Sequence, residues 1–440
     1  MTDADIAAAA PAIVLATGAC AIAVLAASGK GRARALAWLG VLVGAGAAVT
    51  AIAIGSGTPG LGATLARDAA GTFFAVLVGL AAAAGLALAG SDPRLAHRLR
   101  RHEVALVLFS SCGAALLCVA NDLVVLFVAL ALASVPLFVL DRSGPRYYLR
   151  GATSSAVALY GIALLYTATG ETGYAGLGRA THNPLYLAGL ALVLAGLTFH
   201  AVLGARRTWS VAASIAAFAA LARLAAATRS GEAALDWQVS LATIAALCFA
   251  LGALAALAEQ RLGRLLQYAT VSQAGYVLTA LAASAAPAAA FAVTISTTIA
   301  LGTFGVFGLI RAPEGDAPTL RDLAGLARQR PLIVVALGVL MSALVGLPPT
   351  AGFLAKLYVF EVATRAQLLW LVVLGALAAV VSTAACVRVL LACFAPPPLQ
   401  AIAHPPARVG TAIVLLAAFA VVVVGIWPGA LLELAQAVRF

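Results

Sequence analysis

Lys356 ends a segment whose residue types interrupt a helix inside an apolar run. The segment reads Gly346-Leu-Pro-Pro-Thr-Ala-Gly-Phe-Leu-Ala-Lys356, with Pro348 and Pro349 before Gly352. Proline lacks a backbone N–H, so the helical hydrogen-bond ladder breaks here. In an apolar medium the freed backbone groups must line a cavity or be buried in protein. A lysine just past such a break is a candidate proton carrier; the alternative is an ammonium that reaches out to the polar interface.

His200 is the second candidate for proton chemistry. It ends the apolar run 185–199, and imidazole titrates near neutral pH, which suits a proton relay. The alternative is a histidine at the edge of the apolar layer, close to Arg206 and Arg207.

Five other charged residues lie inside or beside apolar runs. Arg223 and Arg388 fall within runs, where each is expected to pair with a neighbour or to reach the interface. Asp122 and Asp68 each precede a run and are expected to be helix N-caps. Glu103 opens a run, where an acid suits the helix dipole.

The motifs of soluble catalysis are missing from the sequence. It contains no phosphate-loop pattern, no H-E-x-x-H zinc pattern and no G-x-S-x-G elbow. The six cysteines form no C-x-x-C pair, so we expect small core residues and no metal site. We therefore expect no catalytic residue and no cofactor in this chain.

The elements that must position these residues are membrane-spanning. The chain has 440 residues, of which 63% are hydrophobic and 10% charged, with a mean hydropathy of +1.06. A soluble domain carries roughly 25% charged residues. The apolar runs are continuous rather than alternating, which favours helices over a barrel. The net charge of +11 is explained by basic cytoplasmic loops rather than by a nucleic-acid partner.

The sequence predicts an all-α, polytopic membrane protein of about fourteen transmembrane helices. Their expected ranges are 9–28, 35–55, 70–90, 103–119, 122–141, 150–169, 187–204, 209–228, 238–258, 265–282, 289–310, 332–363, 368–393 and 409–427.

Charge alternates between successive loops. The loops after odd-numbered helices, such as 29–34 and 91–102, are basic, whereas loops after even-numbered helices, such as 283–288, carry little or no positive charge. Basic loops stay in the cytoplasm, so we expect both termini on the non-cytoplasmic side of the cell inner membrane.

The helices divide into four expected parts. Residues 1–102 are expected to form an N-terminal three-helix segment, and residues 103–229 a first repeat. Residues 238–393 are expected to form a second repeat, and residues 394–440 a loop with a C-terminal helix. Helices four to eight are echoed by nine to thirteen, as in transporter folds built from inverted repeats.

Several segments, in order, resemble the antiporter-like subunits of respiratory complex I, and the N-type subunit in particular. The helix-ten signature is matched by Arg264-Leu-Leu-Gln-Tyr-Ala-Thr-Val-Ser-Gln-Ala-Gly-Tyr276. The N-type subunit is matched by Leu323-Ala-Gly-Leu-Ala-Arg-Gln-Arg-Pro331, by residues 346–360, and by shorter segments at 121–123, 134–137, 147–156 and 159–166. The resemblance covers residues 60–395 and implies fourteen helices, both termini outside, broken helices seven and twelve, and an inverted repeat.

The resemblance also implies proton half-channels built on buried glutamate and lysine residues. The lysine of broken helix twelve matches Lys356, and the lysine of helix seven matches His200. Four other charged or titratable family positions are occupied by neutral residues: the helix-five glutamate by Ala131, the helix-eight lysine by Ser214, the helix-ten histidine by Gln273 and the lysine before that signature by Gly263. The lysine that opens helix six is matched by Arg146.

The resemblance implies a membrane-arm subunit of a complex I-like NADH:quinone oxidoreductase, a proton-translocating enzyme in which this chain holds no redox centre. Flavin, iron–sulfur clusters and quinone are then expected elsewhere in the complex, and the partners are lipid and other membrane-arm subunits, including further antiporter-like ones. Two mechanisms are open: His200 and Lys356 relay protons, or the channel is degenerate and the subunit is a spacer. The alternatives are a subunit of a cation/proton antiporter or of a membrane-bound hydrogenase-type complex, and a stand-alone transporter.

Overall fold

A computed structural model describes most of the chain as helices. The described residues are 3–28, 32–57, 64–91, 101–140, 145–178, 183–203, 208–228, 234–310, 319–396 and 408–438. Within these ranges there is no β-strand, only three isolated bridges between loop residues. The expected all-α class is confirmed.

Within the described ranges, twelve helices are long and apolar enough to cross a membrane. They are α1 (Asp3–Ala27), α2 (Ala33–Ile54), α3 (Ala69–Ser91), α5 (Arg101–Val119), α6 (Leu123–Leu140), α7 (Pro145–Thr169), α9 (Pro184–Leu203), α10 (Val211–Ala227), α11 (Ala234–Ala258), α13 (Ala286–Gly308), α17 (Leu369–Phe394) and α18 (Arg408–Ile426).

Two further crossings complete the expected set. The more polar α12 (Leu262–Ala282) is long enough to span, and α15 (Pro331–Val345) and α16 (Ala351–Arg365) together occupy the expected helix 332–363. The expected break in that helix is therefore confirmed. The break that the resemblance implies in helix seven is not visible within α9, and residues 204–207, which follow it, lie outside the described residues.

Four short helices were not expected from the sequence. They are α8 (Tyr174–Leu177), α14 (Leu326–Gln329), α19 (Gly429–Gln436) and the 3-10 helix η2 (Leu320–Leu323). Three of the four have only four residues, which is too short for hydrophobic periodicity to reveal them.

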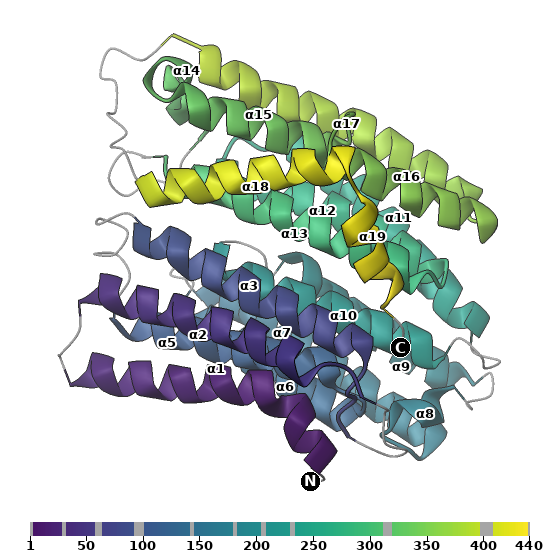
Figure 1. Cartoon of the computed structure of the whole chain (residues 1–440). Helices are drawn as coiled ribbons and strands as arrows, with labels where there is room; N and C mark the ends of the chain where they lie inside the picture. Colours follow the sequence, from purple (N-terminus) through teal and green to yellow (C-terminus); the bar gives the residue numbers. More distant parts are fainter. Residues whose placement is uncertain are drawn as a thin grey trace.

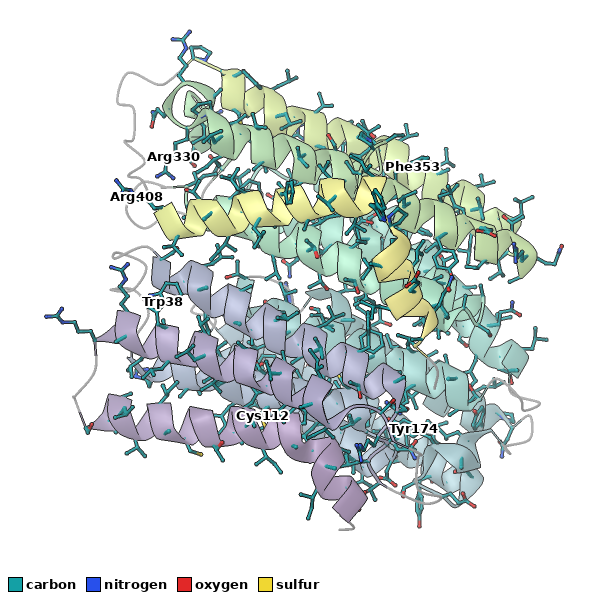
Figure 2. The ribbon with its side chains drawn as sticks, viewed as in Figure 1. Trp38, Cys112, Tyr174, Arg330, Phe353 and Arg408 are labelled. Atoms are coloured by element: carbon teal, nitrogen blue, oxygen red, sulfur yellow. The ribbon has the colours of Figure 1, made fainter. Side chains whose placement is uncertain are left out.

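Figure 1 shows the spanning helices running roughly side by side, with α1 to α10 in one half of the bundle and α11 to α18 in the other. The start of α1 and the end of α19 lie at the same end of the bundle, which we call the terminus end (Figure 1). Tyr174 lies toward this end, whereas Arg330 and Arg408 lie at the opposite end (Figure 2). An even number of crossings follows.

The interior is packed with small side chains. In α10 every residue from Val211 to Leu224 is buried, and half of these are alanine. Between α2 and α3, a Cβ added to Gly79 would lie 2.8 Å from the carbonyl oxygen of Gly44. Small residues let helix backbones approach closely in a membrane, where packing rather than hydrophobicity drives association.

Candidate functional site

The break between α15 and α16 begins at Gly346. This residue adopts φ 89°, a left-handed conformation that ends α15 and that glycine adopts without steric cost. Thr350 precedes α16, and its Oγ1 donates to the carbonyl of Leu347 at 2.6 Å. The last carbonyls of α15 therefore point into the protein with no helical N–H to bind them.

Lys356 supplies the missing donors. Its side chain is 8% exposed, and its Nζ donates to the carbonyl oxygens of Leu344 at 2.8 Å and Val345 at 2.6 Å. The ammonium also lies 4.6 Å from the centre of the Tyr276 ring. A cation at a helix C-terminus and over an aromatic face is favourable. The side chain thus binds the break instead of reaching the interface.

Helix α12 braces the same break. Gln273 donates from Nε2 to the carbonyl of Leu344, so its amide shares an acceptor with Lys356. Tyr276 donates from its hydroxyl to the carbonyl of Gly375 in α17 at 2.8 Å. Within the described residues no carboxylate forms an ion pair with Lys356. The structure therefore brings Lys356 and Gln273 together, with carbonyl oxygens as their partners.

The break is tightly packed on both sides. A Cβ at Gly352 would overlap the carbonyl oxygen of Ala343, and a Cβ at Gly425 of α18 would overlap that of Pro349. Only glycine fits at these two positions. Pro348 and Pro349 lie in the non-helical link, whereas Gly352, which was also expected in the break, lies in the first turn of α16.

His200 lies in a separate environment near the end of α9. It is 7% exposed, and its Nε2 lies 3.1 Å from the hydroxyl of Ser155 on α7. The centre of its ring lies 6.5 Å from the centre of the Phe138 ring and 5.9 Å from that of the Phe199 ring. The imidazole is therefore buried between helices. The alternative was a position of His200 at the interface beside Arg206 and Arg207, and these two arginines lie outside the described residues.

The remaining family positions contribute no charge. Ser214 is 7% exposed, and its hydroxyl has no hydrogen-bond partner among the described residues. Ala131 is half-buried in α6, while Gly263 is exposed at the start of α12. Helix α10, which carries Ser214, packs against α9 and α12, but among the described residues no hydrogen bond or ion pair joins His200 to Lys356.

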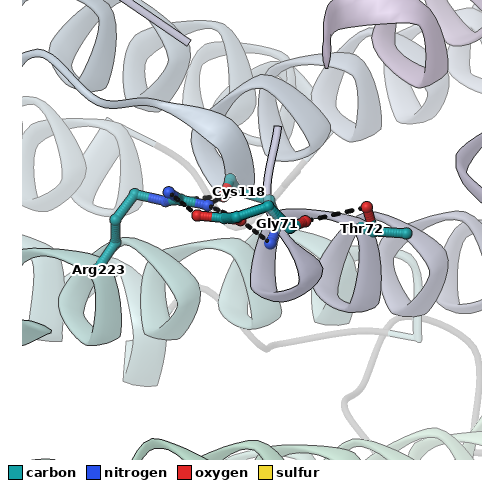
Figure 3. A network of polar contacts seen from close by, with 5 residues as sticks. Gly71, Thr72, Cys118 and Arg223 are labelled. Atoms are coloured by element: carbon teal, nitrogen blue, oxygen red, sulfur yellow. Dashed lines mark hydrogen bonds and ion pairs between the residues drawn. The ribbon is translucent and has the colours of Figure 1, made fainter. Parts of the chain in front are cut away.

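The pairing of Arg223 was left open by the sequence. Its guanidinium forms an ion pair with Asp68, and Asp68 also accepts from the N–H of Gly71 at 2.6 Å, as an N-cap does (Figure 3). Asp122 likewise caps α6 by accepting from the N–H of Val124 at 2.7 Å. Both expected caps are confirmed.

Arg388 lies in the second half of the chain. It donates to the carbonyls of Leu257 and Glu259 at the end of α11. Within the described residues, no group of three or more His, Cys, Asp or Glu side chains is placed to hold a metal ion.

Comparison with known proteins identifies the family. Residues 120–382 match the family described as NADH:quinone oxidoreductase/Mrp antiporter, TM. The NADH-quinone oxidoreductase subunit N of Salinibacter ruber is 35% identical over 375 residues, which cover 75% of this chain and 74% of that protein. The chain belongs to this family, in its subunit N group.

Solved structures agree with this assignment. A chain in respiratory complex I from Thermus thermophilus with bound aureothin is 30% identical, with a TM-score of 0.83, and 98% of this chain matches 100% of that one. A chain of the Mrp complex from Dietzia sp. is 20% identical, with a TM-score of 0.80, and 98% of this chain matches 96% of that one. The second likeness shows the fold alone.

Proposed function

We propose that this chain is a membrane-arm subunit of a complex I-type NADH:quinone oxidoreductase. The observation that carries the proposal is the match, along nearly the whole chain, to a chain of a respiratory complex I at 30% identity. Relatives named NADH-quinone oxidoreductase subunit N support it. The antiporter and hydrogenase-type alternatives have weaker support, because the Mrp likeness is at 20% identity.

The electron-transfer groups belong to other subunits in this proposal. The described residues offer backbone carbonyls, one lysine and one histidine in the interior, rather than the clustered thiolates or imidazoles that iron–sulfur clusters require. We place the termini on the non-cytoplasmic side, because the opposite end of the bundle carries Arg330 and Arg408 (Figure 2) and basic residues stay in the cytoplasm.

Within the enzyme, the chain acts as a spacer whose own proton channel is degenerate. A coupled relay needs neighbouring groups whose charges change each other's proton affinity. Ala131 and Ser214 are neutral, and no carboxylate among the described residues pairs with Lys356. Lys356 is instead held by two carbonyls of the break, which favours a structural role.

The second candidate role is a reduced relay through His200 and Lys356. It is favoured by one observation, the burial of both titratable side chains in the interior of a membrane protein.

Co-purification tests membership in the enzyme. The chain, tagged and extracted from its native membrane in mild detergent, should be isolated together with flavin- and iron–sulfur-containing subunits and with NADH:quinone reductase activity. Isolation with other antiporter-like subunits but without flavin would contradict the proposal. A tagged unrelated membrane protein from the same membrane controls for aggregation.

A further inference from the structure

The Asp68–Arg223 ion pair lies at the terminus end of the bundle and plays no part in the break. Arg223 is 4% exposed, and its two terminal nitrogens donate to the two carboxylate oxygens of Asp68 at 2.6 and 2.8 Å. Its Nε and Nη2 also donate to the carbonyl of Cys118 at 3.2 and 3.0 Å (Figure 3). Such two-pronged, charge-assisted contacts are among the strongest that side chains make.

The pair joins the ends of three helices. Asp68 caps the N-terminus of α3, Cys118 lies in the last turn of α5, and Arg223 lies in the last turns of α10. The carboxylate therefore faces the positive end of one helix dipole, and the guanidinium faces the negative end of another. Both charges are stabilised where they lie, in addition to their mutual attraction.

The packing around the pair is tight. A Cβ at Gly71 would lie 3.0 Å from Nη2 of Arg223 and 3.0 Å from Oδ1 of Asp68. A guanidinium has donors and no acceptor, and Arg223 donates to both carboxylate oxygens of Asp68 and to the carbonyl of Cys118. The pair is therefore a fixed contact between these helices.

We propose that Asp68 and Arg223 form a latch that fixes α10 to α3 and α5 and keeps the terminus end of this helix cluster closed to water. The cost of burying either charge alone is large, so the closed arrangement is strongly favoured only while both partners are present. The latch is a property of this fold, and it holds whether or not the subunit carries protons.

The thiol of Cys118 reports on the latch directly. Cys118 is 1% exposed and its own carbonyl accepts from Arg223. In the purified intact complex, a maleimide should label it only when the cluster opens. Labelling of Cys118 is followed with time by peptide mass spectrometry, with Cys386 of α17, which is 5% exposed, as the internal reference.

Arg223→Met and Asp68→Asn should each increase the rate of Cys118 labelling by about tenfold or more, because labelling follows the free energy of local opening. Arg223→Lys keeps the charge and is expected to assemble, but it cannot hold both partners, so it should give a smaller increase. The matched control is Asp122→Asn, which removes a capping carboxylate near the same end and should leave Cys118 unchanged.

Unchanged labelling of Cys118 in assembled Arg223→Lys and Asp68→Asn complexes would overturn the latch. So would an equal increase in Asp122→Asn, since that would indicate general loosening of this end. Neither result depends on proton pumping, so failure of the latch is distinguishable from failure of the proposed function.

Discussion

Gly352→Ala should prevent assembly of this subunit, so that the complexes in the membrane lack it. The added methyl group would overlap the carbonyl oxygen of Ala343 in α15, and neither backbone can yield without separating α15 from α16. Overpacking of this kind costs about 1–3 kcal/mol and more where backbone must move. The measurement is the amount of this subunit in the purified complex, by quantitative mass spectrometry.

The control for Gly352 is another glycine of the broken helix. Gly338→Ala in α15 meets only one atom, Cδ2 of Leu390, at 3.9 Å, and should assemble normally. Normal assembly of Gly352→Ala would show that α15 and α16 can separate enough to admit a methyl group.

Lys356→Met should lower the thermal stability of the assembled subunit. The change removes the donor of the Val345 carbonyl, while the Leu344 carbonyl keeps the amide of Gln273. A buried carbonyl left without a partner costs about 1–3 kcal/mol. The temperature at which this subunit dissociates from the purified complex measures the loss.

Lys356→Gln separates hydrogen bonding from charge. Its amide still donates to carbonyl oxygens, so stability should recover in part although the charge is gone. If Lys356→Gln and Lys356→Met were equally unstable, the charge itself would be what the break requires, and the account of Lys356 as a hydrogen-bond donor would be wrong.

The spanning helices were predictable because each has a local cause. A continuous apolar run long enough to cross a bilayer must be helical there. The break was predictable for the same reason, since Pro348 and Pro349 remove two backbone donors wherever the chain places them. Asp68 and Asp122 were recognisable as caps from their position just before an apolar run.

The contacts between helices were not predictable, because they join residues far apart in the chain. Asp68 and Arg223 are separated by 155 positions, and His200 and Ser155 by 45. No local pattern pairs them. The partners of Lys356 were hidden for a different reason, because they are backbone carbonyls and carry no signature in the sequence.

The proposed spacer role rests on the neutral residues at family positions. Ala131 and Ser214 stand where the resemblance implies a glutamate and a lysine, and α10, the helix that carries Ser214, is largely buried and rich in alanine. Lys356 and His200 are the titratable candidates that remain at family positions, and within the part of the chain that the structure describes no hydrogen bond or ion pair joins them. These features support the proposal that the chain acts as a spacer in the membrane arm.

The most direct measurement is the number of protons translocated per NADH oxidised by the purified complex in liposomes. This ratio is measured for the native complex and for three variants: His200→Ala, Lys356→Gln, and the double variant in which both residues are alanine. Each ratio is normalised to the amount of assembled enzyme. If the chain is a spacer, the ratio should be the same in all of them. A lower ratio in the His200 or Lys356 variants, with this subunit still present, would contradict the spacer role and place the chain among the proton carriers.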